Sequence, residues 1–271
     1  MAEGLAGHTI FSLANRRRLE HWTWMPPGHP GRDLPVVVLL HGVRDAGGFV
    51  WWEKGAADRT AARLVAAGEL PPFCLVMAGD TGAELGSGYC DWVDGTTAAE
   101  TYLVGELLPW IDAELPVPSD RHVAGLSMGG YGALLLALRN PGTFDSASAT
   151  SGFFDPQRLF QYVPDARRRM WGDDDALMAA HDITSLVSDP ARRTGLRLAL
   201  DCGTEDPLLD ASRGFHAHLD RLGVAHGYVE RPGGHDWGYW RGRLADHLRF
   251  HLGAHGDLAA PALAGSEVTR T

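Results

Sequence analysis

The sequence has little cysteine, no excess of basic residues and no long apolar run, and each shortage excludes a class of protein. Its 271 residues include 3 Cys, an odd number that argues against a disulfide framework. The 24 Lys and Arg against 34 Asp and Glu give a formal net charge of -10, which argues against a nucleic-acid or anionic-membrane binder. No apolar stretch approaches the length that crosses a membrane.

The N-terminal sequence also lacks a basic start followed by an unbroken apolar segment, which an export signal requires. We therefore expect a cytoplasmic protein with no membrane span. Histidine is abundant, with 13 copies, yet His216 and His218 stand two apart on a predicted helix and so point to different faces. These two are interpreted as surface residues rather than a metal pair, and we expect no metal and no cofactor.

What the sequence does contain is an alternation of short apolar runs and helical patterns from about residue 36 to about residue 253. Strands are predicted at 34–42, 73–78, 121–124, 146–150, 196–202 and 226–230, after an antiparallel hairpin of 8–13 and 18–24. Helices are predicted at 58–68, 97–115, 128–139, 208–222 and 239–252. This order predicts an α/β fold with a mostly parallel central sheet, helices on both faces and an N-terminal antiparallel hairpin.

No linker or repeat interrupts the chain, so residues 1–253 are expected to form a single domain. The segment 154–186 is a candidate lid, and residues 254–271 are expected to form a flexible C-terminal tail. Thr97 and Glu100 have the spacing of a capping box, which predicts a helix start there.

The stretch "VAGLSMGGYG", residues 123–132, places Ser127 between two glycines, after a predicted strand and before a predicted helix. The five-residue pattern G-x-S-x-G is weak by itself in a chain with 34 Gly. The strand-to-helix context strengthens it, because a Cβ at Gly125 or Gly129 would crowd the tight turn that presents the serine. The helix N-terminus there also favours developing negative charge.

A nucleophilic serine needs a base, and parallel sheets place their sites at the carboxyl ends of the strands. Two predicted strands end in the loops "GTEDPLLD" and "RPGGHDWGYW", which supply acids and His235. The order serine, acid, histidine is the order of α/β hydrolases. His41, inside "LLHG", is interpreted as a structural histidine near the site.

Four carboxylates compete to orient His235. Asp201 lies within a predicted strand and Asp210 within a predicted helix, so neither is placed to reach the histidine. Glu205 and Asp206 both lie in the loop at the carboxyl end of the strand, and Pro207 biases Asp206 towards an extended backbone. The residues alone leave both open.

Attack on a carbonyl creates an oxyanion that needs preorganised donors. The backbone N–H of Met128 is expected to be one donor, and the loop "HGVRDAGG" is expected to supply the second through Val43, with Gly42 next in line. Gly42 would also let the backbone approach a substrate.

Several aromatic residues fall in loops expected at the same edge of the sheet. Trp51, Trp52, Trp92 and Trp237 are predicted to wall a pocket as a group, although core packing is the better interpretation of each one taken individually. Asp91 is expected to add a polar contact to a hydroxyl-bearing substrate.

The pieces "LLHG", "GLSMGGYGAL", "SGFF", "DCGTEDPLL" and "GGHDWGYW" together resemble the family of α/β hydrolases called Putative esterase. That family includes S-formylglutathione hydrolases, feruloyl and acetylxylan esterases, enterochelin esterases and mycolyltransferases. The resemblance covers about residues 35–250 and implies a single-domain α/β-hydrolase fold, Ser127 as nucleophile and His235 as base. The family's G-x-x-D spacing favours Asp206 as the acid, with Glu205 in reserve.

The predicted function is hydrolysis of a carboxylic ester or thioester through an acyl-enzyme. An acyltransferase that passes the acyl group to an alcohol shares every catalytic residue and is the main alternative, and a non-catalytic binding module is less favoured. The partner is expected to be a small-molecule ester, with no nucleic acid, and a homo-oligomer is left open.

Overall fold

An eight-stranded sheet organises the chain, with strand order β1-β2-β4-β3-β5-β6-β7-β8. The computed structural model describes residues 3–29, 34–45, 47–79, 81, 86–115, 120–154, 165–172, 174–253 and 258. The strands are β1 (Leu5–Ser12), β2 (Arg17–Trp24), β3 (Val36–Leu40), β4 (Cys74–Ala78), β5 (Arg121–Leu126), β6 (Ser146–Thr150), β7 (Arg197–Gly203) and β8 (His226–Arg231).

The N-terminal hairpin and the rest of the sheet are built differently. β1 and β2 pair antiparallel, with Leu5 opposite Trp24, and β2 also runs antiparallel to β4. From β4 to β8 every neighbouring pair is parallel, so the carboxyl ends of these strands meet at the same edge. The predicted α/β fold, with its mostly parallel sheet and N-terminal hairpin, is confirmed.

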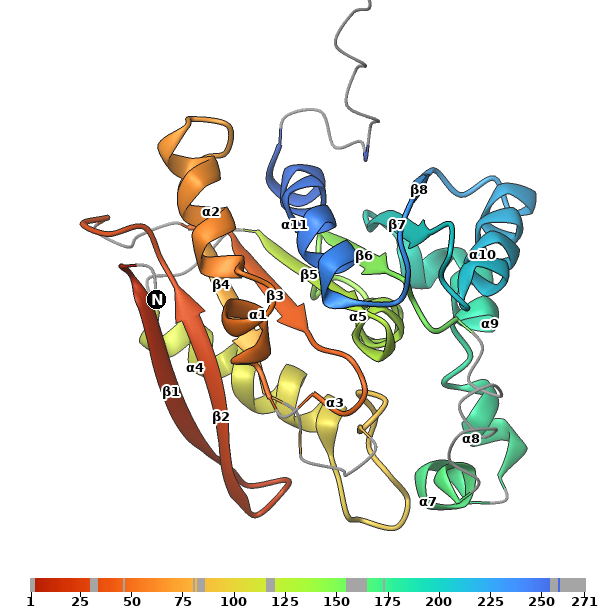
Figure 1. Cartoon of the computed structure of the whole chain (residues 1–271). Coiled ribbons are helices and arrows are strands. Elements are labelled where there is room, and N and C mark those ends of the chain that lie inside the picture. Colours follow the sequence, from red (N-terminus) through yellow and green to blue (C-terminus); the bar gives the residue numbers. More distant parts are fainter. Residues whose placement is uncertain are drawn as a thin grey trace, which may run out of the picture.

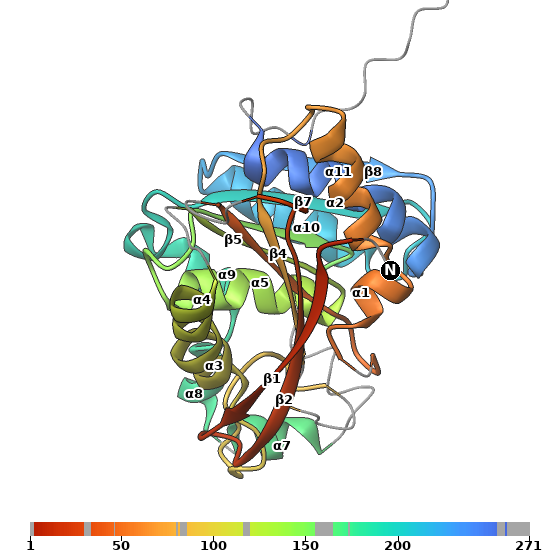
Figure 2. The same cartoon turned by 90° about the vertical axis from the view of Figure 1, so that its left-hand side faces the viewer.

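Helices cover both faces of the sheet, as Figures 1 and 2 show from two sides. The first face carries α3 (Ala99–Tyr102), the π-helical turn η1 (Leu103–Leu107), α4 (Leu108–Glu114), α5 (Met128–Arg139), α9 (Ile183–Ser188) and α10 (Leu209–Arg221). The second face carries α1 (Val50–Glu53), α2 (Ala57–Ala66) and α11 (Trp237–Leu252). The remaining helices are α7 (Ala166–Trp171), α8 (Asp175–Ala179) and the 3-10 turn η2 (Pro190–Arg193).

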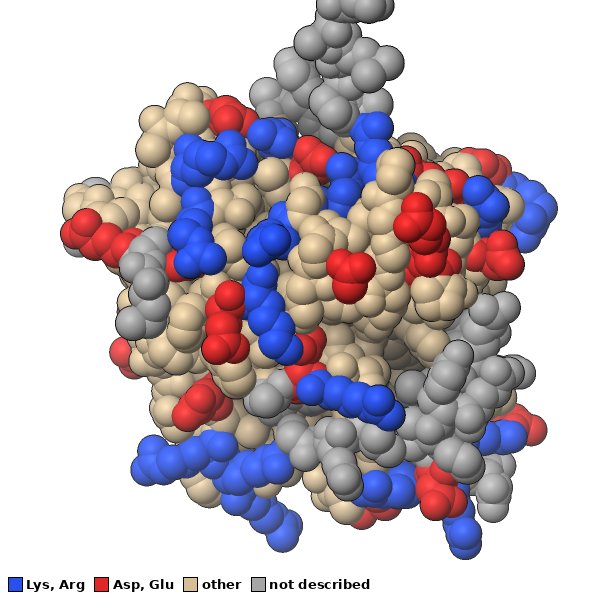
Figure 3. All heavy atoms as spheres, viewed as in Figure 1, with Lys and Arg blue, Asp and Glu red and all other residues tan. Residues whose placement is uncertain are grey.

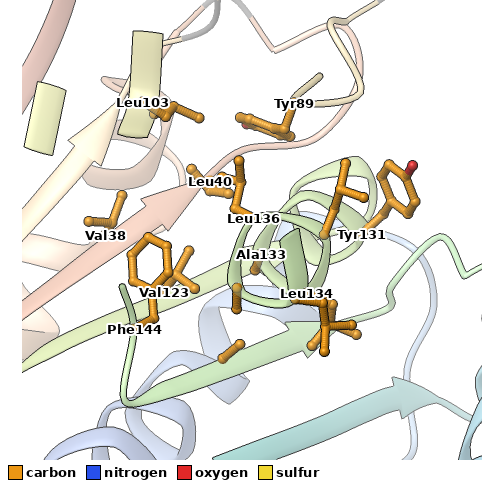
Figure 4. Packing of buried hydrophobic residues seen from close by; sticks show 14 of the residues in the cluster. Val38, Leu40, Tyr89, Leu103, Val123, Tyr131, Ala133, Leu134, Leu136 and Phe144 are labelled. Carbon is orange, nitrogen blue, oxygen red and sulfur yellow. The ribbon is translucent and has the colours of Figure 1, made fainter. Parts of the chain in front are cut away.

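The alternation of side chains along β3 explains why both faces are covered. Val38 and Leu40 point into the cluster beneath α5, where Figure 4 shows Leu40 beside Leu136. Val37 and Leu39 point into the opposite cluster, beneath α2 and α11. All five residues of β3 are buried, which is why the run carries no polar alternation.

The predicted helix at 97–115 is interrupted, and the expected capping box is wrong. The N-cap of α3 is Ala98, and no side chain of its own caps it. The Thr97 hydroxyl instead hydrogen bonds to the hydroxyl of Thr81. Asp91 takes over the capping task, because its carboxylate accepts hydrogen bonds from the amide and the hydroxyl of Thr101.

The candidate lid at 154–186 contains α7, α8 and part of α9 in its described portion, whereas residues 155–164 and 173 lie outside the described residues. Apart from Leu258, the predicted tail also lies outside them. Among the described residues, no helix is both long and apolar enough to cross a membrane. On the face shown in Figure 3, basic and acidic side chains lie beside one another.

Candidate active site

Ser127 sits on a strained turn between β5 and α5. Its backbone has φ 53° and ψ -118°, an uncommon conformation for a residue with a side chain. A Cβ at Gly125 would lie 2.0 Å from the carbonyl oxygen of Gly129, and a Cβ at Gly129 would lie 2.1 Å from that of Leu40. Both glycines are therefore required, as the sequence pattern predicted. The Ser127 amide donates to the Thr150 carbonyl over 2.9 Å and holds the turn against β6.

The side chains of Ser127, His235 and Asp206 form a continuous hydrogen-bonded chain. His235 lies in the loop between β8 and α11, and its Nε2 is 2.9 Å from the Ser127 Oγ. Its Nδ1 is 2.9 Å from Oδ2 and 3.1 Å from Oδ1 of Asp206. An ionised carboxylate only accepts hydrogen bonds, so Nδ1–H donates to Asp206 and Nε2 is left to accept the serine proton.

The Asp206 carboxylate is completely buried, whereas the side chain of His235 is 27% exposed. Burial favours the neutral acid, but hydrogen bonds from His235, from the Leu208 amide and from the Ser151 hydroxyl outweigh it and lower the pKa of Asp206. The acid therefore stays ionised at neutral pH and stabilises a positively charged His235.

The two residues predicted to supply oxyanion donors, Met128 and Val43, line the same cavity as the serine. Met128 is the first residue of α5, where helical geometry leaves the N–H without a partner in the helix. Val43 follows β3, next to Gly42, whose added Cβ would lie 3.5 Å from the Ser127 Cβ. Within the described residues, neither N–H donates a hydrogen bond to a protein oxygen. Both residues line the cavity, so their amides can serve as donors to a charge that develops beside Ser127.

The cavity beside Ser127 and His235 has a volume of about 660 Å³, which suits a small organic molecule. Its lining residues are mostly apolar or aromatic, with a charged rim. They are Gly42, Val43, Arg44, Asp45, Lys54, Gly88, Ser127, Met128, Tyr131, Phe153, Met170, Trp171, Pro207, Leu208, His235, Asp236, Trp237 and Trp240. At the rim, the Lys54 ammonium lies 3.2 Å from the Asp45 carboxylate.

Of the residues expected to touch substrate, Gly42 and Trp237 line this cavity. The structure gives the other four different positions. Trp51 is buried behind Trp237, with ring centroids 5.4 Å apart, and Trp52 packs against Trp22 of the hairpin.

Trp92 and Asp91 also lie outside the cavity lining. The Trp92 indole N–H donates to the Ser87 carbonyl over 2.8 Å, and the guanidinium of Arg169 stacks on its ring. Asp91 caps α3 through Thr101. Loop position at the sheet edge is shared by all four residues, but it does not decide which way a side chain turns.

Further residues that support the site were not among the predicted site residues. Trp240 lies edge-on to the His235 ring at a centroid distance of 4.9 Å, and its N–H donates to the Ser151 hydroxyl. Ser151 directly follows β6, so the rule that sites form at strand ends would have found it. Met170 and Trp171 of α7 come from the candidate lid and line the cavity.

The competing acids point elsewhere. Asp201 is fully buried, and its carboxylate accepts from the Arg243 guanidinium over 2.7 Å and from the Tyr239 hydroxyl over 2.9 Å. It also lies 2.9 Å from Nε2 of His247, whose Nδ1 is 2.8 Å from the hydroxyl of Ser148.

Of the remaining two acids, Glu205 is exposed and donates its amide to the Gly233 carbonyl. Asp210 is in the first turn of α10. His41 is buried, with Nδ1 2.9 Å from the Gly42 carbonyl oxygen. Asp206 is thus the carboxylate that contacts His235.

Comparison with known proteins shows that the chain is similar to esterases. The family model described as "Putative esterase" matches residues 16–251. An acetyl esterase of Caldicellulosiruptor saccharolyticus is 28% identical over 233 residues, which cover 79% of this chain and 82% of that protein. An S-formylglutathione hydrolase of Bos taurus is 27% identical over 257 residues, covering 89% and 90%.

The solved structure of a ferulic acid esterase superposes with a TM-score of 0.79 at 28% identity, covering 92% of this chain and 97% of the other. Two esterases of Mycobacterium tuberculosis are longer proteins, of which the match covers 49%.

Proposed function

Because the chain belongs to the Putative esterase family and is a carboxylic ester hydrolase, we propose that it cleaves its ester by covalent catalysis at Ser127. The observation that carries this proposal is the 2.9 Å approach of the His235 Nε2 to the Ser127 Oγ, with Asp206 on the other ring nitrogen. A serine hydroxyl is a weak nucleophile unless a base takes its proton, and this geometry supplies the base.

In the first half of the reaction, the Ser127 oxygen attacks the ester carbonyl while His235 accepts the proton. The negative charge that develops on the carbonyl oxygen is met by the amides of Met128 and Val43, and the positive charge on the imidazole is met by Asp206. The tetrahedral intermediate collapses to the acyl-enzyme as the C–O bond breaks. The bonding electron pair goes to the alcohol oxygen, which takes the proton from His235 and leaves as the alcohol.

In the second half, His235 takes a proton from water, which attacks the acyl carbon. Collapse of this second intermediate returns the proton to Ser127 and releases the carboxylic acid. Orientation of His235 is decisive in both halves, because the same nitrogen must accept and then deliver each proton. The edge-on packing of Trp240 and the buried Asp206 hold the ring for this purpose.

The cavity supports a substrate with an apolar or aromatic group next to the scissile bond. Phe153, Trp171, Trp237 and Trp240 are among its lining residues, and most of the lining is apolar or aromatic. Relatives are named for acetyl, S-formylglutathione and ferulic acid esters, so the family alone leaves the substrate open. We expect kcat/KM to rise from acetyl esters to esters whose apolar group fills the cavity, and a panel of acyl and aryl esters, with a thioester included, measures this ranking.

The test of the mechanism is covalent labelling with a fluorophosphonate, followed by mass spectrometry of the labelled peptide. We expect one label, on Ser127, and loss of both label and ester turnover in Ser127→Ala. The Ser148→Ala variant is the matched control, because Ser148 also contacts a histidine but is fully buried, and it should label like the parent. A label on another residue, or turnover that survives in Ser127→Ala, would refute the proposal.

A further inference from the structure

A second cluster of chemically active side chains lies away from the catalytic cavity, between α10 and β8. His216 and Asp220 are one helical turn apart on α10, so they share a face, and His226 begins β8 opposite them. One potential ligand atom from each of the three residues lies within 4.8 Å of the others. The side chains of His216 and Asp220 are 33% and 61% exposed, so the cluster is open to solvent.

The hydrogen bonds of His226 fix which of its nitrogens is available. Its Nδ1 lies 2.7 Å from the Val224 carbonyl oxygen, which only accepts, so Nδ1 carries the proton. In the neutral ring Nε2 is then a lone pair directed outward, and it lies 2.7 Å from Nδ1 of His216. A histidine whose other N–H is held by a backbone carbonyl is the usual arrangement of a metal ligand.

The same hydrogen-bond assignment leaves two acceptors facing each other at His216. If its Nδ1–H donates to His226, its Nε2 in the neutral ring is also a lone pair, and it faces a carboxylate oxygen of Asp220 at 3.5 Å. An ion bound at Nδ1 removes this mismatch, because the ring proton of His216 then sits on Nε2 and faces the carboxylate as a donor. The Tyr228 ring stacks flat on His216, with centroids 4.1 Å apart, and holds the imidazole in this orientation.

We propose that His216, Asp220 and His226 form a binding site for a divalent transition metal ion of the zinc class. Two imidazoles and a carboxylate are ligands that Zn²⁺ prefers, and a tetrahedral ion with bonds of ~2.0–2.1 Å brings its ligand atoms to about 3.3 Å from one another. The exposed Asp220 reaches this spacing by side-chain rotation. The ion takes the place of the proton between the two histidines, that proton moves to Nε2 of His216 so that the ring stays neutral, and water fills the remaining position.

The position of this site gives it a structural task. Asp206 lies just before α10 and His235 just after β8, and the proposed ion joins these two elements near their far ends. It would therefore stabilise the packing of α10 against β8, the elements next to Asp206 and His235, without contacting the cavity. This site agrees with the prediction that His216 and His218 do not bind a metal together, because the second histidine of the site is His226 of β8.

The experiment uses the full chain without an affinity tag, stripped with a chelator and dialysed against Zn²⁺. We expect about one bound ion per chain by elemental analysis and a Tm that rises with the Zn²⁺ concentration, since the ion binds the folded state. In His216→Ala and His226→Ala, both the stoichiometric ion and the Tm rise should be lost. His218→Ala is the matched control on the same helix and should behave like the parent.

Co²⁺ provides a second readout, because its visible absorption reports nitrogen and oxygen ligands even in a variant of lowered stability. Parent and His218→Ala should give the same spectrum, and Asp220→Asn should bind more weakly. Absence of binding by the parent, or equal binding by the parent and a His216→Ala/His226→Ala double variant, would overturn the proposal. Neither result bears on Ser127, so this test is independent of the catalytic mechanism.

Discussion

The molecule contains two chains of aspartate, histidine and serine that share their composition but differ in their surroundings. In the candidate active site Asp206, His235 and Ser127 are linked by contacts of 2.9 Å. Beneath α11, Asp201, His247 and Ser148 are linked by contacts of 2.9 and 2.8 Å. Distances alone do not distinguish the two sets.

Solvent access of the histidine distinguishes the two sets. The side chain of His235 is 27% exposed and that of His247 is 3% exposed, although both carboxylates are completely buried. Ser127 precedes a helix whose first N–H is available, whereas Ser148 lies in the middle of β6 and also contacts Nε2 of His251 at 2.8 Å. The proposed catalytic set therefore faces a cavity with room for a carbonyl group. In the buried set every polar side-chain atom contacts another protein group.

The comparison separates two uses of the same chemistry. The buried set joins β6, β7 and α11, with Arg243 bound to Asp201 as a further tie. We interpret it as a structural connection, which holds in place the helix that begins directly after His235. A reactive constellation thus requires a cavity and free donors as well as three residue types in line.

The largest effect should come from Asp206→Asn. An amide at this position can hold His235 in the wrong tautomer, and in the best-studied triad the equivalent change lowers turnover by about 10⁴. The variant should remain folded by circular dichroism. Steady-state kinetics beside Glu205→Gln makes the comparison, since Glu205 is exposed and its loss should leave turnover near that of the parent. Near-normal turnover in Asp206→Asn beside a large loss in Glu205→Gln would show that Glu205 is the acid.

Asp201→Asn should have the opposite result to Asp206→Asn. We expect it to lower the free energy of unfolding and to change turnover little. Removing one partner of a buried ion pair costs about 3–5 kcal/mol, and we expect the lower end because Arg243 keeps its contact with Asp246. Denaturant unfolding measures the free energy, and active-site titration with a fluorophosphonate corrects turnover for the folded fraction. If Asp201→Asn loses turnover as severely as Asp206→Asn while its stability is unchanged, the structural interpretation is wrong.

The pH dependence of stability sharpens the same comparison. Burial opposes ionisation of Asp201, but His247 and Arg243 outweigh it and lower its pKa below the ordinary 3.8. A lowered pKa contributes stability that is complete above the unfolded value and is lost as the pH falls below about 4. The difference in unfolding free energy between the parent and Asp201→Asn should therefore shrink below that pH. A difference that stays constant or widens on acidification would contradict this account.

The smallest expected effect concerns the tryptophans. Trp237→Ala removes cavity wall and should change the ratio of kcat/KM between aryl and acetyl esters by about tenfold, the order expected for a modest apolar contact. Trp51→Ala is the control, because Trp51 is buried behind Trp237 and its truncation should lower stability by about 3–5 kcal/mol. An unchanged ranking of ester substrates in Trp237→Ala would show that Trp237 does not contact the bound substrate.

The sequence was sufficient for the sheet, the serine turn and the placement of His235, because each depends on local pattern or chain order. Apolar runs identify strands covered on both faces, and the glycines beside Ser127 reflect a close backbone approach within a few residues. The lining of the cavity was less predictable. Trp92 and Trp237 both lie in loops at the sheet edge, yet only the packed structure determines which of them turns inward.

The buried set of Asp201, His247 and Ser148 could not be predicted from the sequence for a related reason. Ser146, Ser148 and Thr150 of β6 are spaced like any polar alternation, and nothing local shows that histidines of α11 lie over them. The capping of α3 by Asp91 is similar, since the carboxylate reaches across ten positions in sequence to Thr101. Contacts between distant segments depend on tertiary packing, which periodicity does not encode.

The positive φ of Ser127 has a consequence for which nucleophiles this enzyme can acquire by mutation. At φ 53° a side chain branched at Cβ meets the backbone, so threonine is excluded even though its hydroxyl has the same chemistry. Cysteine has the shape of serine and fits the turn, and glycine fits it without strain but has no nucleophile. Between the two residues that would keep a hydroxyl or thiol nucleophile at this position, the backbone therefore favours cysteine over threonine.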